Sequence, residues 1–195
     1  MSNKFIKKQL DFIVTNMGMT DIYEIDKIRY GLELFYGEFS KLIVMILVSL
    51  ILDKFSAFLL MITLLMLIRP YIGGSHAKNY INCMIQSNLS FILIYYLAYL
   101  LPSINLIIQF FFILFCIIVT RKFKPVNSNR EEIQTQYKKI KFKNFVSAIF
   151  IIWFIISNIF LSKYYINCGL LIIFYIILDF LWEVCKNEKK NLWLN

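Results

Sequence analysis

One short stretch of the chain brings together two residue types that can act jointly in nucleophilic catalysis. His76 is the only histidine among the 195 residues, and Cys83 follows it seven positions later. Two glycines, Gly73 and Gly74, stand just before this pair. A thiol is a strong nucleophile only as the thiolate, and a histidine side chain, with a pKa of about 6.5, accepts and returns a proton near neutral pH. The pair therefore predicts a cysteine nucleophile with a histidine base.

The spacing of the pair restricts the backbone between the two residues. On an unbroken α-helix, residues seven apart are separated by about 10.5 Å along the axis, whereas proton transfer needs a contact of about 3 Å. We therefore expect His76 in a loop after Gly73-Gly74 and Cys83 in a helix that begins near Lys78. The spacing indicates no third, orienting group. The structural alternative is a packed cysteine and a histidine that is only hydrogen-bonded at a helix end.

The composition of the chain indicates a lipid environment. Hydrophobic residues make up 59% of the sequence, mean hydropathy is +0.67, and 17% of residues are charged, against about 25% in typical globular proteins. A chain of this length has too little interior to bury so much apolar surface. The net charge of +9 suits contact with anionic lipid or an acidic partner. No pattern indicates a nucleic-acid partner, and no cleavable signal peptide is apparent.

The four cysteines are not arranged for disulfides or metal binding. No two of them form a Cys-x-x-Cys pair, and only one histidine is present to complete a zinc site. We expect no metal and no other cofactor. The cysteines are Cys83, Cys116, Cys168 and Cys185.

Apolar periodicity predicts an all-α polytopic membrane protein with about six transmembrane or re-entrant helices in hairpins, preceded by N-terminal amphipathic helices. Met17-Gly18-Met19 should end the first amphipathic helix, and Asp21 with Glu24 should cap the second. Several apolar runs have only about 13 to 17 residues, fewer than the ~20 that usually span a bilayer. The six runs lie at about 39–52, 55–68, 89–101, 104–120, 145–162 and 165–184.

The predicted organisation is one membrane-embedded domain over residues 1–195, divided by these runs. Its segments are amphipathic helices at 1–38, a hairpin at 39–68, an active-site segment at 69–88, a hairpin at 89–120, a basic loop at 121–144, a hairpin at 145–184 and a tail at 185–195. With six crossings, every lysine-rich segment lies on one side, which is cytoplasmic by the positive-inside rule. Four crossings and one re-entrant hairpin give the same sidedness. Both termini, His76 and Cys83 are then expected on the cytoplasmic side.

The stretch from Arg69 through Gly73, Gly74 and His76 to Cys83 resembles the active-site signature of the accessory gene regulator B (AgrB) family, the membrane endopeptidases of Gram-positive quorum sensing. Two weaker segments agree with this resemblance. Residues 29–33 resemble the family's Arg-x-Gly-x-Glu segment, and residues 124–127 resemble its proline-containing motif. The similarity covers roughly residues 25–135, and it implies a location in the bacterial cell membrane.

The resemblance implies a definite chemistry. Cys83 would attack a peptide bond of a short AgrD-type propeptide, with His76 as general base and then general acid. A thioester would remain on the enzyme, and a cysteine or serine of the peptide would close a thiolactone or lactone ring. Arg69, Gly74 and Glu33 match positions that the family needs. For Arg69 we expect a partner in Glu33 or in an acidic stretch of the propeptide; for Gly74, a backbone shape that sets His76.

The basic loop has two interpretations. It holds the cytoplasmic side against anionic lipid, or it captures the acidic tail of the propeptide by electrostatic steering. The lysines that would bind such a tail are Lys138, Lys139, Lys141 and Lys143.

Two non-enzymatic alternatives remain open at the level of sequence. A transporter is disfavoured because the apolar runs contain almost no ionisable residues, Asp179 being the clearest. A membrane scaffold would make His76 and Cys83 incidental. A serine protease is disfavoured by the absence of a Gly-x-Ser-x-Gly elbow with a second histidine. Short hairpins leave lipid-mismatched surface, which favours self-association as a homodimer.

Overall fold

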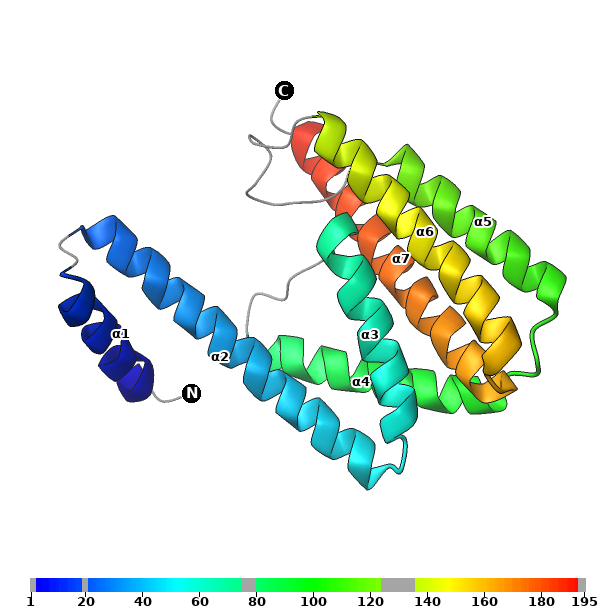
Figure 1. Cartoon of the computed structure of the whole chain (residues 1–195), viewed down its shortest axis with the longest axis horizontal. Coiled ribbons are helices and arrows are strands. Elements are labelled where there is room, and N and C mark those ends of the chain that lie inside the picture. Colours follow the sequence, from blue (N-terminus) through cyan, green and yellow to red (C-terminus); the bar gives the residue numbers. More distant parts are fainter. Residues whose placement is uncertain (1–2, 19–20, 75–79, 124–135, 193–195) are drawn as a thin grey trace. The chain divides into compact units, whose positions relative to one another are not determined.

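The computed structural model describes residues 3–18, 21–74, 80–123 and 136–192, and within these ranges it forms seven helices and no strand (Figure 1). The predicted all-α fold is confirmed. Five helices (α2, α3, α4, α6 and α7) are long and apolar enough to cross a membrane. The helices are α1 Asn3–Met17, α2 Ile22–Ile51, α3 Phe55–Ile72, α4 Tyr80–Leu100, α5 Leu106–Lys122, α6 Gln136–Phe160 and α7 Lys163–Leu192.

The chain divides into two compact units, residues 1–53 and 54–195. In the first unit, α1 packs on α2 through Tyr36, whose hydroxyl donates to Gln9 at 2.5 Å and whose ring meets Phe5 edge-on at 5.5 Å. Asp21 caps α2, since its carboxylate accepts from the backbone N–H of Tyr23 at 3.0 Å. The predicted start of this helix is therefore confirmed.

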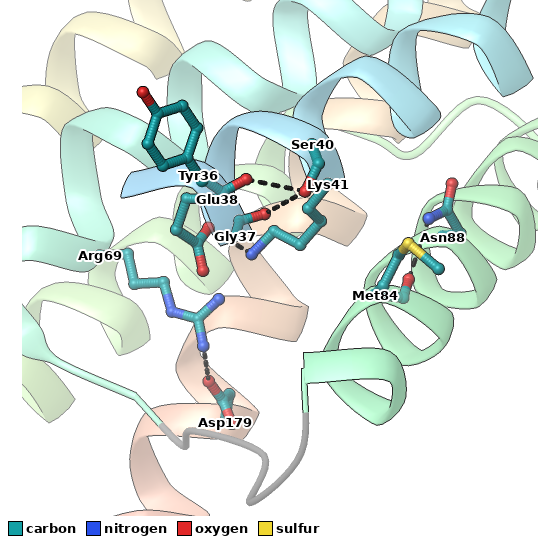
Figure 2. A network of polar contacts seen from close by, with 9 residues as sticks. All are labelled: Tyr36, Gly37, Glu38, Ser40, Lys41, Arg69, Met84, Asn88 and Asp179. Atoms are coloured by element: carbon teal, nitrogen blue, oxygen red, sulfur yellow. Dashed lines mark hydrogen bonds and ion pairs between the residues drawn. The ribbon is translucent and has the colours of Figure 1, made fainter. Parts of the chain in front are cut away.

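Helix α2 differs from the prediction because it continues without a break from the second amphipathic segment into the first apolar run. The chain has no proline between them, and Gly37 alone does not end a helix. The Ser40 hydroxyl donates back to the carbonyls of Tyr36 and Gly37 at 2.8 and 3.0 Å, within the helix (Figure 2). The boundary placed at residue 38 is a change of polarity along one helix.

In the second unit, α7 is the central helix and contacts α3, α4, α5 and α6. Half of its apolar span is buried, against a third or less of the spans of α3, α4 and α6. Trp153 of α6 packs directly on Gly169 of α7: a Cβ at Gly169 would overlap the Trp153 ring, so only glycine permits this approach. The fully buried side chains of α7 are Asn167, Cys168, Ile172, Ile173, Ile177 and Phe180.

Polar contacts join the helices of this unit at both ends. At one end, the Asn167 side-chain amide donates to the carbonyls of Ala98 and Leu101 at 3.3 and 3.2 Å, which ties the start of α7 to the end of α4. Asn158 near the end of α6 donates to Gln109 near the start of α5 at 3.1 Å. This end carries the α4–α5 turn, which falls where the predicted apolar runs 89–101 and 104–120 meet.

The opposite end of α5 is tied to the opposite end of α6. The Lys143 ammonium donates to the carbonyl of Arg121 at 2.6 Å, in the last turn of α5. Because α5 and α6 are bonded near both ends of α5, they are antiparallel and lie side by side over the length of α5 (Figure 1). The 17 residues of α5 amount to about 25 Å of helix. This length runs beside α6 from Lys143 to Asn158.

Candidate active site

The candidate site begins where α3 ends. Gly73 terminates the helix with φ of 84°, and its N–H donates to the carbonyl of Arg69 at 2.9 Å. Side chains with a Cβ rarely adopt this left-handed region, so glycine is the residue that permits the turn. The sequence-based expectation that the backbone leaves the helix at the two glycines is confirmed.

Arg69 forms an ion pair with Asp179, a residue 110 positions further along the chain. The Arg69 Nη2 lies 3.3 Å from the Asp179 Oδ2, which joins the last turn of α3 to the central helix α7 (Figure 2). The Asp179 side chain is 12% exposed and the Arg69 side chain 29% exposed. Removing one member would leave the other charge inside an apolar bundle, which is costly.

Gly74 lies directly against this ion pair. A Cβ at residue 74 would lie 2.5 Å from the Asp179 Oδ2 and 3.1 Å from the Arg69 Nε. The first distance is shorter than real Cβ contacts allow, so a larger residue would displace the carboxylate or the backbone. The two glycines are therefore required for different reasons. Gly73 adopts a positive φ, and Gly74 leaves room for a charged pair.

Cys83 lies in the first turn of α4 and is half-buried. Helix α4 begins at Tyr80, close to the predicted start near Lys78, and so begins after His76 in the described chain. His76 itself lies outside the described residues, and its distance from Cys83 stays a prediction. All four cysteines lie in the described part of the chain, and no disulfide joins any of them.

The lysines predicted to bind an acidic tail lie on α6 rather than in a connecting loop. This helix begins at Gln136, nine residues before the predicted apolar run, because lysine and glutamine are good helix formers and no proline or glycine interrupts them. Lys143 caps the end of α5, whereas Lys141 is exposed. The side chains of Lys138 and Lys139 lie outside the description.

Glu33 is an exposed residue of α2, in the first unit. Its predicted pairing with Arg69 stays a prediction. Arg69 instead pairs with Asp179 in the described part of the chain, and the sequence analysis did not place Asp179 in the site. A usable signal was present, because Arg69 and Asp179 are each the only charged residue in a long apolar stretch, and they have opposite signs. Two isolated charges inside a membrane bundle are expected to pair.

The described second unit thus carries Cys83 at the start of a membrane-length helix and an ion pair against the backbone at Gly74. A family model described as accessory gene regulator B matches residues 6–185. The chain belongs to the accessory gene regulator B family. It is therefore a member of a membrane family that takes part in accessory gene regulator quorum sensing.

Individual AgrB relatives agree with this assignment. An AgrB-like protein of Clostridium beijerinckii is 29% identical over 133 residues, which cover 68% of this chain and 65% of that relative. The accessory gene regulator protein B of one Staphylococcus aureus strain is 30% identical over 149 residues, covering 74% of this chain and 76% of the relative. The chain thus spans a little under two thirds of the first relative. No solved structure matches the chain.

Proposed function

We propose that this chain is a membrane cysteine endopeptidase that processes a short AgrD-type propeptide, with Cys83 as the nucleophile and His76 as the base. The observation that supports this most is the break in the helical backbone at Gly73, after which α4 starts anew at Tyr80 with Cys83 in its first turn. One straight helix through both residues would have kept them about 10.5 Å apart. The described backbone does not impose that separation.

The proposed reaction has two transfers of one acyl group. His76 takes the proton of the Cys83 thiol, and the thiolate attacks a peptide carbonyl of the propeptide. The peptide C–N bond breaks, the leaving amine takes the proton from His76, and the N-terminal part of the propeptide remains on Cys83 as a thioester. A cysteine thiolate of the same peptide then attacks this thioester, which forms the thiolactone ring and releases the Cys83 thiolate.

Cyclisation competes with hydrolysis, and the site must favour the first. Exchange of one thioester for another is nearly balanced in energy, whereas hydrolysis is downhill and irreversible in water. Holding the peptide thiol beside the acyl group raises its effective concentration strongly. Excluding water from the same place lowers the competing rate. The position of Cys83 near the end of an apolar helix, half-buried, suits both requirements.

We further infer that Cys83, Arg69 and the lysines of α6 face the cytoplasm, with both termini on that side. The packing of α5 along α6 supports six crossings, because α5 would then cross beside the five longer apolar helices. The exposed Lys141 would then meet an acidic propeptide tail or anionic lipid at that surface. Transport is a weaker reading, since the charge of Asp179 is paired with Arg69.

The direct test uses the protein in liposomes with a candidate short, cysteine-containing propeptide of the AgrD type. Mass spectrometry should find the released C-terminal tail and a dehydrated N-terminal product from the wild-type chain. Cys83→Ala and His76→Ala should lower the cleavage rate by 10²-fold or more at equal membrane content. A propeptide whose ring cysteine is replaced by alanine should leave a hydroxylamine-sensitive adduct on Cys83.

Cys185→Ala is the matched control, because Cys185 is an exposed cysteine of the same chain outside the candidate site. It should process the propeptide at the wild-type rate. Cleavage that survives Cys83→Ala would reject the proposed nucleophile. A wild-type chain that binds the propeptide and leaves it intact would favour a non-enzymatic scaffold.

A further inference from the structure

The contacts around Asp179 tie three parts of the chain together at the edge of the candidate site. Asp179 lies on the central helix α7, Arg69 on the last turn of α3, and Gly74 two residues before His76 in the active-site segment. Among the described residues, the Asp179 carboxylate is the group closest to the position of a Gly74 Cβ. A residue of the last helix therefore sets the boundary of a segment that lies a hundred residues earlier.

We propose that Asp179 is a positioning residue for the His76–Cys83 pair, acting through Arg69 and the backbone at Gly74. This inference rests on the proposed function. The carboxylate fixes the Arg69 side chain, and together they form the surface on which Gly74 lies. Because His76 is two residues after Gly74, their Cα atoms are at most ~7.6 Å apart. Fixing Gly74 therefore limits where the imidazole can go.

The cost of the ion pair argues that it does more than hold α3 to α7. Replacing a buried ion pair by apolar residues of similar size is often neutral or stabilising, and the neighbouring contacts of α7 are apolar. A pair of leucines would join the two helices as well. A charged pair differs in being directional, and directional contacts suit a site in which a displacement of about 1 Å costs about 10²-fold in rate.

The central place of α7 makes it a firm support for this purpose. Phe180, next to Asp179, is 1% exposed, and Ile176 and Ile177 in the preceding turn are 3% and 2% exposed. The Asp179 backbone is thus held by packed neighbours on α7. The backbone at Gly74 therefore lies against a neighbour that is fixed on a well-packed helix.

The test measures the reactivity of Cys83, which a purely structural contact would not change. Asp179→Asn removes the charge at nearly constant size. With iodoacetamide as the probe and peptide mass spectrometry as the readout, Cys83 alkylation near neutral pH should slow by about tenfold or more. Its pH profile should move toward that of His76→Ala, because a displaced imidazole no longer takes the thiol proton. Alkylation of Cys185 in the same molecules should not change.

Glu183→Gln is the matched control for the loss of one buried acid. Glu183 lies one turn after Asp179 on α7, its side chain is 15% exposed, and it pairs with Lys186 on its own helix at 3.5 Å. This variant should keep the wild-type Cys83 profile. If Asp179→Asn alone fails to fold, Arg69→Gln/Asp179→Asn removes both charges and leaves neither unpaired. The double variant should fold and show the same slow Cys83.

The outcomes separate the two proposals. A Cys83 rate and pH profile unchanged in folded Asp179→Asn, or a fall shared equally by Cys185, would overturn the positioning role. Equal propeptide cleavage by wild type and Asp179→Asn would overturn it while leaving the proposed function intact. A wild-type chain that fails to cleave the propeptide would count against the proposed function, and the alkylation profiles would still decide the role of Asp179.

Discussion

At the scale of single residues, the site depends on two glycines that lack a Cβ as much as on its charged side chains. Gly73 has no Cβ to resist a φ of 84°, and Gly74 has no Cβ to collide with the Asp179 carboxylate. Arg69 then occupies the space beside Gly74 with a planar, permanently charged group. The absence of a Cβ at these two positions thus permits a charged contact against the backbone two residues before His76.

The first prediction concerns Gly74→Ala. The new methyl group would lie 2.5 Å from the Asp179 Oδ2, so either the carboxylate or the backbone must move. We expect a loss of about 1–3 kcal/mol in the free energy of unfolding, as for other overpacked sites, together with slow propeptide cleavage. Thermal unfolding in detergent and the cleavage assay measure the two effects.

A double-mutant cycle gives the control for that prediction. In an Asp179→Ala background the colliding oxygen is gone, and the nearest remaining atom is the Arg69 Nε at 3.1 Å. The stability cost of Gly74→Ala should then fall to less than half of its value in the wild type. Additive costs would mean that Gly74 is needed for another reason.

At the scale of elements, the first turns of α6 combine a structural lysine with an exposed one. Lys143 donates to the carbonyl of Arg121 at the end of α5, where the helix leaves carbonyls without partners. Lys141 is exposed at the same end of α6. A joint substitution of all four lysines would therefore mix a loss of stability with a loss of substrate capture.

The second prediction separates these two effects. Lys143→Met should lower the free energy of unfolding by about 0.5–1.5 kcal/mol, because it removes a hydrogen bond to the Arg121 carbonyl. Lys141→Gln should change stability by less than about 0.5 kcal/mol and raise the KM for the propeptide. That rise should shrink as the salt concentration increases, because salt screens exposed charges. A KM that does not change in Lys141→Gln at low salt would remove the steering role.

The elements also show how far sequence reasoning reaches. The starts of α2 and α4 and the α4–α5 turn follow local rules of capping, glycine placement and periodicity, so they could be predicted. The continuity of α2 and the early start of α6 could not be predicted in this way. An apolar run marks the part of a helix that lies in the membrane and does not show where the helix begins or ends. The Arg69–Asp179 pair depends on packing between α3 and α7. Apart from these two isolated opposite charges, local patterns do not show which helices become neighbours.

At the scale of the whole molecule, the charge distribution and the polar contacts distinguish the same two ends of the second unit. The contacts of Asn167 and Gln109 lie at the end with the short turn after α4. The contacts of Arg69 and Lys143 lie at the opposite ends of their helices, which carry most of the basic residues. Positive charge is retained on the cytoplasmic side of membrane proteins. The rule thus supports the proposal that the candidate site faces the cytoplasm.

The last prediction tests this sidedness and the crossing of α5 together. Ser103, in the turn between α4 and α5, and Cys185, near the end of α7, are both exposed. In intact cells a membrane-impermeant maleimide should label Ser103→Cys and should leave Cys185 unlabelled until the cells are permeabilised. A Thr15→Cys variant in α1 should behave like Cys185, because an even number of crossings places both ends of the chain on one side. If α5 did not cross, Thr15→Cys and Cys185 would differ, and if the orientation were reversed, both would be labelled in intact cells.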